Sequence, residues 1–398
     1  MDFFKQFLSL FEYATYLDGM DWLKMAVMWA IGGILIYLAI KKDMEPTLLL
    51  PMGFGTILVN LPFSGALGEF IMENGFRAES LDPHAEGGAI TTLFNAGIAN
   101  ELFPLLLFIG IGAMIDFGPI LANPKLMIFG AAAQFGIFFT MCIACLFFNA
   151  EAAASIGIIG AADGPTAIVV ANKLLGADHN ITGAIMVAAY SYMALVPIIQ
   201  PPVIKALTTK KERLIRMDNS GGKPVSKLTK ILFPIVLTII AGIVAPASVA
   251  LVGFLMFGNL IRECGVLDSL SETAQKVLAN LITIFLGITI ANQMHYDKFL
   301  NTDTLLVLGL GLFAFIFDTA GGVLVAKFIN LFLPKNKKIN PMIGAAGISA
   351  FPMSGRVVHK MGLAEDPQNF LLMNSISVNV SGQIASVIAG GIILALFA

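Results

Sequence analysis

One acidic residue stands in an otherwise apolar stretch of the sequence: Asp163, within the run GAADGPT at 160–166. An ionised carboxylate at membrane depth is costly, so a proton or a bound cation must neutralise it. This makes Asp163 a candidate ligand that could exchange Na⁺ for a proton. The alternative is that Asp163 only caps the helix that begins at Pro165 and Thr166, as Asp does at many helix N-termini.

Comparing the chain with itself finds a second set of polar residues. Six residues recur after 187 positions and indicate an internal repeat: Ile156, Gly157, Gly160, Pro165, Val170 and Lys173 match Ile343, Gly344, Gly347, Pro352, Val357 and Lys360. At the same separation the polar residues differ: Asp163 pairs with Ala350, Ala162 with Ser349, and Tyr192 with Asn379. Carboxylate, hydroxyl and amide oxygens suit a small hard cation, so we expect Na⁺ ligands among Asp163, Tyr192, Ser349 and Asn379.

Other polar residues extend the candidate site. Asn340, which precedes Pro341, is either a further ligand or a helix cap. Arg356 could bind a carboxylate with two hydrogen bonds, or could extend its charged end to the membrane interface. Asp318 is a possible counter-ion to Arg356 or a separate proton carrier. We expect His359 and Lys360 to mark the cytoplasmic end of this segment.

The composition identifies the class of protein that must position these residues. Of the 398 residues, 57% are hydrophobic and only 13% are charged, too few for the surface of a water-soluble globule of this size. The net charge of -2 argues against a nucleic-acid partner, and three cysteines cannot form a disulfide framework. The segment 1–21 lacks the cleavage pattern of a signal peptide and is predicted to be an amphipathic interfacial helix.

The apolar runs predict an all-α polytopic membrane protein. A spanning helix needs about 20 mostly apolar residues. Two runs, 155–174 and 340–358, are too rich in Gly and Pro to be plain spans, and we expect re-entrant or broken-helix hairpins there. Ten runs fit spanning helices: 22–40, 46–62, 98–116, 125–149, 180–205, 228–245, 248–262, 278–294, 303–328 and 369–396.

Basic residues predict the orientation, because short cytoplasmic loops collect Lys and Arg. The linker 206–227 holds most of a seven-residue basic cluster and should be cytoplasmic, whereas the acidic loop 63–97 should lie outside. The chain then divides into two inverted repeats of about five spans and one hairpin each, 22–205 and 228–398. Broken helices at the interface of inverted repeats are common solute sites, because unwound backbone and half-helix ends line a cavity there.

Long motifs in the sequence resemble a known family, the β subunit of biotin-dependent Na⁺-translocating decarboxylases that act on oxaloacetate, methylmalonyl-CoA or glutaconyl-CoA. The resemblance covers nearly the whole chain, and six stretches carry it: GAADGPTAIVV (160–170), AAYSYMALVPIIQPP (188–202), NPMIGAAGISAFPMSGRVV (340–358), EPTLLLPMGFG (45–55), DFGPILANPKL (116–126) and NFLLMN (369–374).

The resemblance implies a pump of the bacterial inner membrane in which decarboxylation of carboxybiotin drives Na⁺ outward and consumes a proton. It implies a carboxyltransferase α subunit, a biotin carrier protein and a small γ or δ membrane subunit as partners, with several β subunits in a complex. It makes Asp163 the residue linked to Na⁺ and the proton, and Tyr192 a participant in the proton step. It assigns functional positions of the second hairpin to Asn340, Gly344, Ser349 and Arg356, and Na⁺ ligation to Asn379.

The residues alone would also fit another function, a Na⁺-coupled secondary transporter of carboxylates, since nothing in them specifies biotin. The sequence contains no phosphate-binding GxxxxGK[ST] loop and no Met-Lys-Met biotin-attachment site. In the decarboxylase interpretation, energy therefore arrives as carboxybiotin on a partner. Arg356 would hold the carboxylate of carboxybiotin, with Asn340 and Gly344 nearby. A non-catalytic membrane anchor would leave the placement of Asp163 and Arg356 in the hairpins unexplained.

Overall fold

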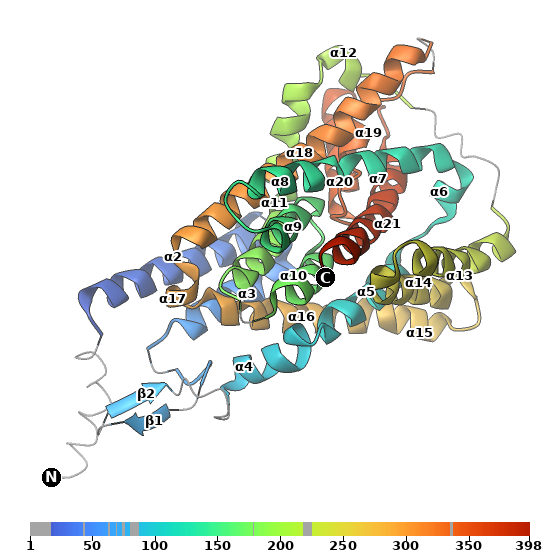
Figure 1. Cartoon of the computed structure of the whole chain (residues 1–398). Helices are drawn as coiled ribbons and strands as arrows, with labels where there is room; N and C mark the ends of the chain where they lie inside the picture. Colours follow the sequence, from blue (N-terminus) through green and yellow to red (C-terminus); the bar gives the residue numbers. More distant parts are fainter. Residues whose placement is uncertain are drawn as a thin grey trace. The chain divides into compact units, whose positions relative to one another are not determined.

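The structure is a computed structural model of the whole chain (Figure 1). It describes residues 17–42, 44–62, 64–68, 70–73, 76–79, 87–177, 179–217, 225–334 and 337–398. Most of the predicted interfacial segment 1–21 lies outside the described residues. So do Lys223 of the basic linker and the side chains of Glu69, Glu73, Arg77, Asp82 and Glu86 in the loop predicted to lie outside.

Long apolar helices confirm a multi-pass membrane protein. Seven helical stretches within the described residues are long and apolar enough to cross a membrane: α2 (Gly19–Lys42), Pro124–Ala144, α11 (Thr182–Leu207), α13 (Lys227–Val244), Asp268–Met294, α18 (Thr302–Phe332) and α21 (Leu372–Phe397). An eighth is possible if the pair Ala89–Ala99 and Leu102–Met114, bent by 62°, forms one span.

The expectation of ten full-length spans was therefore too high. Two of the predicted spans are shorter helices: α3 (Pro46–Val59) has 14 residues and α14 (Val249–Glu263) has 15. A helix of 14 residues is only about 21 Å long, less than the hydrocarbon core of about 30 Å. The loop after α3 also contains a two-stranded antiparallel sheet, β1 (Phe70–Glu73) and β2 (Phe76–Glu79), which the all-helical prediction missed.

The chain forms two compact units, and each contains residues from both predicted repeats. The first unit comprises 1–103 and 283–305. In it, α2 packs on α3, and Asn60 after α3 donates to the Met294 carbonyl at 2.8 Å. Asn60 Oδ1 also accepts from the Tyr296 backbone N–H at 2.8 Å, which fixes the end of α3 to the chain around 294–296.

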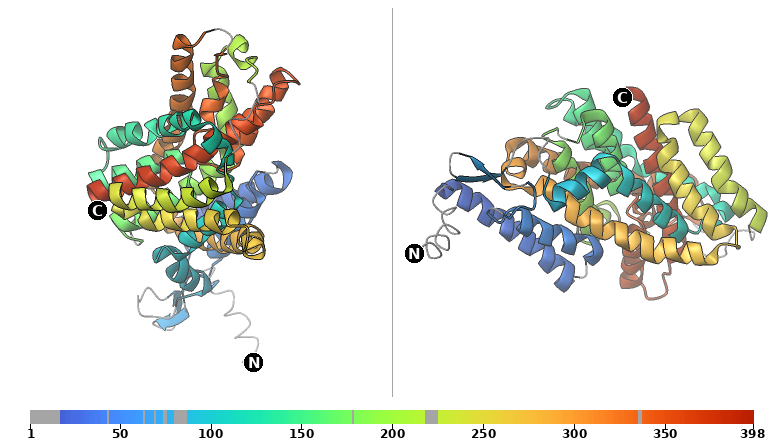
Figure 2. Two further views of the ribbon diagram at one scale, coloured as in Figure 1. Left: turned by 90° about the vertical axis from the view of Figure 1, so that its right-hand side faces the viewer. Right: turned by 90° about the horizontal axis from the view of Figure 1, so that it is seen from below.

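The second unit, 104–282 with 306–398, holds every candidate site residue. Its last helix, α21, contacts α7 (Met127–Ala133), α10 (Gly164–Leu175), α20 (Met353–Glu365) and the turn η5 (Pro246–Ser248) before α14 (Figures 1 and 2). The core is dominated by small and branched side chains, which let helix backbones approach closely, as in other membrane bundles. Helix α21 thus contacts α10, which begins directly after Asp163, and α20, which contains Arg356.

The basic linker is well anchored where the structure describes it. Helix α11 continues to Leu207, and α12 (Lys210–Arg213) follows with a capping box between Thr209 and Glu212. The Arg213 guanidinium donates to Glu365 at 2.6 Å, and Arg216 donates to Asp366 at 2.6 Å, so the linker is tied to the C-terminal end of α20.

Candidate functional site

Both predicted hairpins are interrupted helices. The first consists of α9 (Ala150–Gly157), the 3₁₀ turn η4 (Ile158–Ala161), a break at 162–163 and α10. We call residues 158–163 the first tip. Ala162 there adopts the left-handed conformation, with φ 52°, which turns the chain between the two helical pieces.

The second interrupted helix consists of α19 (Met342–Ala345), non-helical residues 346–352, which we call the second tip, and α20. Helix α20 continues to Glu365, beyond the predicted end at 358. His359 and Lys360 therefore lie inside α20, and their expected place at the cytoplasmic end of the segment stays a prediction. In both cases a helix of 26 residues follows, α11 after the first and α21 after the second.

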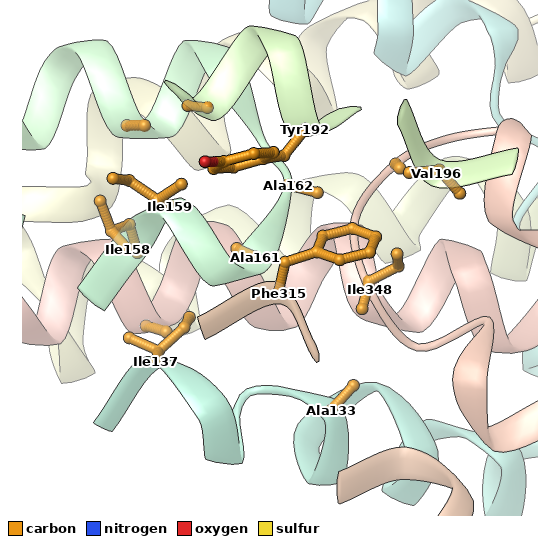
Figure 3. Packing of buried hydrophobic residues seen from close by; sticks show 14 of the residues in the cluster. Ala133, Ile137, Ile158, Ile159, Ala161, Ala162, Tyr192, Val196, Phe315 and Ile348 are labelled. Carbon is orange, nitrogen blue, oxygen red and sulfur yellow. The ribbon is translucent and has the colours of Figure 1, made fainter. Parts of the chain in front are cut away.

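The two tips meet inside the second unit. The Ser349 backbone N–H donates to the Ala161 carbonyl at 2.8 Å. Figure 3 shows Phe315, Ile348 and Tyr192 gathered around Ala161 and Ala162, with apolar side chains filling the space around the contact. Because the contact is between backbones 188 residues apart, it brings the two interrupted helices to one place.

Helix α21 bonds to the second tip through neutral groups. Asn379 Nδ2 donates to the Ile348 carbonyl at 2.7 Å, and Ser349 Oγ donates to the Gly382 carbonyl at 2.9 Å. Asn379 Oδ1 is buried and has no hydrogen-bond partner among the described residues. It is therefore an acceptor that a cation could occupy.

Helix α21 also binds the carboxylate of the first tip. Asp163 is 3% exposed and its Oδ2 accepts from Gln383 Nε2 at 3.0 Å, Ser386 Oγ at 2.9 Å and Thr166 Oγ1 at 2.9 Å. Its Oδ1 accepts from the Thr166 backbone N–H at 3.4 Å, the capping bond of α10. Asp163 is thus a helix cap and, in addition, a buried acid whose partners are all neutral, so its charge is left for a cation or a proton to balance.

Sequence reasoning missed Gln383 and Ser386. A signal was present, because Asn379, Gln383 and Ser386 are spaced by four and three residues within an apolar span, which places them on one helix face. That polar stripe connects the neutral oxygens at the second tip with the carboxylate at the first. Asp163, Ser349 and Asn379, three of the predicted Na⁺ ligands, are brought together around it.

The tyrosines are arranged differently from the prediction. Tyr192 donates its hydroxyl to the Leu308 carbonyl at 2.5 Å, and its ring packs against Gly311, so within the described residues it is not hydrogen-bonded to Asp163. Tyr190, two residues earlier on α11, lies against the start of α10. Its ring covers Gly164, where a Cβ would be 2.5 Å from the ring Cζ, and its buried hydroxyl has no partner among the described residues.

Asn340 has the geometry of a cap. It is fully buried, and its Nδ2 donates to the Arg213 and Ile215 carbonyls at 2.9 and 2.8 Å. Its Oδ1 accepts from the Met342 backbone N–H at 3.1 Å. Of the two alternatives from the sequence, this arrangement favours the cap, and it links the start of α19 to the basic linker.

Gly344 and Arg356 have contrasting positions on the second interrupted helix. A Cβ on Gly344 would collide with the Gly322 carbonyl of α18, so the two backbones touch there. Arg356 is exposed on α20 and forms no ion pair within the described residues. Of the two alternatives for Asp318, that of a counter-ion to Arg356 is therefore wrong. Asp318 is fully buried and accepts from the Ile137 backbone N–H at 3.0 Å instead.

The geometry can therefore bind a small cation at the crossing of two helix breaks and can present a free guanidinium elsewhere on the second interrupted helix. The carboxylate, hydroxyl and amide oxygens at the crossing form a donor set for a hard monovalent cation. The guanidinium of Arg356 is free to bind an anionic group such as a carboxylate.

Comparison with known proteins gives matches over almost the whole chain. Residues 24–397 match the family model described as the Na⁺-transporting oxaloacetate decarboxylase beta subunit. The chain is 47% identical over 395 residues to methylmalonyl-CoA decarboxylase subunit beta of Propionigenium modestum, covering 97% of this chain and 98% of that protein. It is 44% identical over 414 residues to the oxaloacetate decarboxylase beta chain of Klebsiella pneumoniae, covering 93% and 94% of the two chains.

Proposed function

Because the chain belongs to the family of the Na⁺-transporting oxaloacetate decarboxylase beta subunit, we propose that it is the membrane subunit of a sodium-pumping decarboxylase. In this proposal it releases CO₂ from carboxybiotin that a partner delivers. The reaction is coupled to outward Na⁺ transport and consumes a proton. The observation that carries the proposal is the crossing of the two tips. There Ser349 of the second tip bonds to Ala161 of the first, and both tips bond to α21, through Asp163 in the first and through Ser349 and Ile348 in the second.

Outward Na⁺ transport needs an energy source, because moving one charge against 100 mV costs about 2.3 kcal/mol. Carboxybiotin is the substrate that would provide it. Arg356 fits this substrate, since its exposed guanidinium forms no ion pair within the described part of the chain and can take a carboxylate with two hydrogen bonds. Asn340 and Gly344 then shape the same segment, one by anchoring it to the basic linker and the other by close packing.

We assign Na⁺ to Asp163, Ser349 and Asn379. The Asn379 Oδ1 atom supplies an acceptor without a competing donor, and Asp163 supplies the charge. A proton that reaches Asp163 removes that charge and releases Na⁺. Tyr192 remains a candidate for the proton step. Tyr190 becomes one because its ring lies beside Gly164 and its hydroxyl has no partner among the described residues.

The packing of small residues supports the proposal of two inverted repeats. The sequence pairs Phe54-Gly55 with Phe257-Gly258 and the run 108–111 with 285–288. In the first unit, a Cβ on Gly55 would lie 3.1 Å from the Ile288 carbonyl. In the second unit, a Cβ on Gly258 would collide with the Ile109 carbonyl. Equivalent helices thus make equivalent contacts, and each pair joins one element from each repeat.

The remaining parts of the proposal concern location and partners. We place the protein in the bacterial inner membrane with the linker 206–227 in the cytoplasm, following its basic residues. The partners in this assembly are a carboxyltransferase α subunit, a biotin carrier protein, a small γ or δ membrane subunit and further copies of this chain.

Purification separates this function from that of a carboxylate carrier. A tagged chain expressed in its native host should copurify with a biotinylated protein and be retained on avidin. The complex in proteoliposomes should release CO₂ from free carboxybiotin in a Na⁺-dependent reaction. The proposal is wrong if the chain purifies alone and instead catalyses Na⁺-driven uptake of a carboxylate without biotin.

A further inference from the structure

Within the described residues, only two acidic side chains are buried, Asp163 and Asp318. The proposed function uses Asp163. Asp318 lies in the middle of α18 with 0% exposure. A carboxyl group at such a position in a spanning helix is costly and is a functional candidate by default.

One oxygen of Asp318 has a structural partner. Helix α8 (Phe135–Ala144) begins after an interruption at Gln134, which leaves its first backbone N–H groups without partners in their own helix. Asp318 Oδ1 accepts from one of these, the Ile137 N–H, at 3.0 Å. This bond accounts for one oxygen as a cap supplied by another helix.

The other oxygen has no partner among the described residues. Asp318 Oδ2 is buried without a hydrogen bond and lies against Gly160 of the first tip, where a Cβ would be only 2.7 Å away. Any other residue at position 160 would displace this oxygen or the tip. Gly160 therefore covers Oδ2 directly, and Gly160 is three residues from Asp163.

Burial without a partner sets the protonation state. An ionised carboxylate with one bare oxygen in an apolar surrounding is far more costly than the neutral acid. The neutral acid still lacks an acceptor for its O–H as long as the first tip covers it.

We propose that Asp318 is a second proton-carrying residue of the pump, closed off by the first tip in this conformation and opened when that tip moves. Upon opening, the Oδ2–H bond breaks and its proton passes to the entering water. A proton from water re-forms that bond before the tip closes. The inference rests on the proposed function, because it assumes that the first tip moves during transport.

The surroundings of Asp318 offer few other titratable groups. Helix α8 has only the exposed Cys142, and the turn η4 has none. On α11, Tyr192 packs near Gly311 and bonds to Leu308, ten residues before Asp318 on α18. Asp163 is the nearest acid in the first tip. A change in pH dependence caused by substitution at 318 can therefore be assigned to Asp318 or to its coupling with Asp163.

The test compares Asp318→Asn with wild type in the complete complex in proteoliposomes. The amide oxygen keeps the bond from Ile137, so the cap is retained while the exchangeable proton is lost. The matched control is Thr319→Val, which removes a buried hydroxyl on the same helix that has no partner among the described residues. We expect Asp318→Asn to lower the number of protons consumed per Na⁺ ion transported and to shift the pH profile of transport by about one unit or more. Thr319→Val should change neither.

A measurement on the wild-type complex covers the case in which the variant fails to fold. Dicyclohexylcarbodiimide modifies protonated carboxyl groups in membranes, and mass spectrometry locates the modified residue. We expect modification of Asp318 during turnover and protection at rest, when Gly160 covers it. The inference is overturned if Asp318 is never modified, or if Asp318→Asn matches wild type in both coupling ratio and pH profile. Failure of the proposed function would appear differently, as absence of Na⁺-dependent CO₂ release in the wild type.

Discussion

The two interrupted helices have related sequences but different chemistry at their tips. The first tip contains Asp163, whose carboxylate accepts from three side-chain donors. The second tip contains Ser349 and bonds through neutral groups, its backbone N–H to Ala161 and its hydroxyl to Gly382. Both copies thus keep the interruption in the helix, whereas only the first copy has a carboxylate at its tip.

This asymmetry has a consequence for ion binding. Two carboxylates at the crossing would repel each other and hold a proton or two cations, whereas one carboxylate among neutral oxygens matches a single positive charge. Helix α21 donates hydrogen bonds to both tips, from Asn379 to the second and from Gln383 and Ser386 to the first. Movement of either tip relative to α21 therefore alters the ligand set.

The largest effect is expected when the charge of the first tip is removed. Asp163→Asn keeps the shape of the side chain, replaces one acceptor oxygen with an NH₂ donor, and leaves the cation without a negative partner. We expect loss of Na⁺-dependent decarboxylation of free carboxybiotin, assayed as CO₂ release with and without Na⁺. Ser377→Ala is the control, since the bond that its hydroxyl makes among the described residues lies within its own helix, to the Met373 carbonyl at 2.7 Å. A variant that remains active and Na⁺-coupled would falsify the role of Asp163.

Adding a methyl group to equivalent glycines tests how tightly each copy is packed. In Gly344→Ala, the added Cβ would collide with the Gly322 carbonyl. In Gly157→Ala, the added Cβ would lie 2.6 Å from the Ile137 carbonyl, which is the less severe of the two contacts. We expect both variants to be destabilised by about 1–3 kcal/mol or more, with Gly344→Ala the less stable of the two. Thermal unfolding of the purified variants in detergent measures this, and the reverse order would contradict the comparison.

A smaller effect is expected at the neutral tip. Ser349→Ala removes a hydroxyl bonded to Gly382 and one proposed ligand, but retains the carboxylate. The half-saturating Na⁺ concentration should rise about tenfold, because the binding free energy lost is roughly that of one hydrogen bond to a charged group. The maximal rate should change little. Ser381→Ala is the control, because that hydroxyl bonds to Val378 in its own helix. Equal Na⁺ dependence in Ser349→Ala and wild type would exclude Ser349 as a ligand.

The smallest effect concerns the linker attached to the second interrupted helix. The hydrogen bond from Arg216 holds the pKa of Asp366 below its usual 3.8. A lowered pKa means that this contact contributes above pH 3.8 and is lost as the pH falls through the lowered value. A spin label at Met217→Cys should therefore be more mobile in acid, and Arg216→Gln should show that mobility already at neutral pH. Equal mobility at neutral pH with and without Arg216 would show that the contact does not anchor the linker.

The residues of the candidate site could be proposed from the sequence because their signals are local. The recurring Gly and Pro residues predicted both interruptions, and a lone Asp in an apolar run marked Asp163. Partners of these residues were harder to predict, since Gln383 and Ser386 reach Asp163 only through a crossing of helices more than 200 residues apart. The same limit explains Asp318, whose partner Ile137 is 181 residues away.

Span counting failed for a physical reason as well. An apolar run of 17 residues at 46–62 contains a helix that ends at Val59, because Asn60 turns its side chain to the Met294 carbonyl and to the Tyr296 N–H. Hydrophobicity alone does not reveal this tertiary end to the helix. The hydrogen bond from Tyr192 to the Leu308 carbonyl is also a tertiary contact, so the sequence did not reveal it either.

The central claim is that Na⁺ binds where the two tips cross. A crystal structure of the complex with thallium(I) in place of Na⁺ tests it directly, because anomalous scattering locates the ion. We expect one ion coordinated by Asp163 together with the oxygens of Ser349 and Asn379, displaced by excess Na⁺. An ion bound at another place, with Asp163 still held only by Gln383, Ser386 and Thr166, would contradict it.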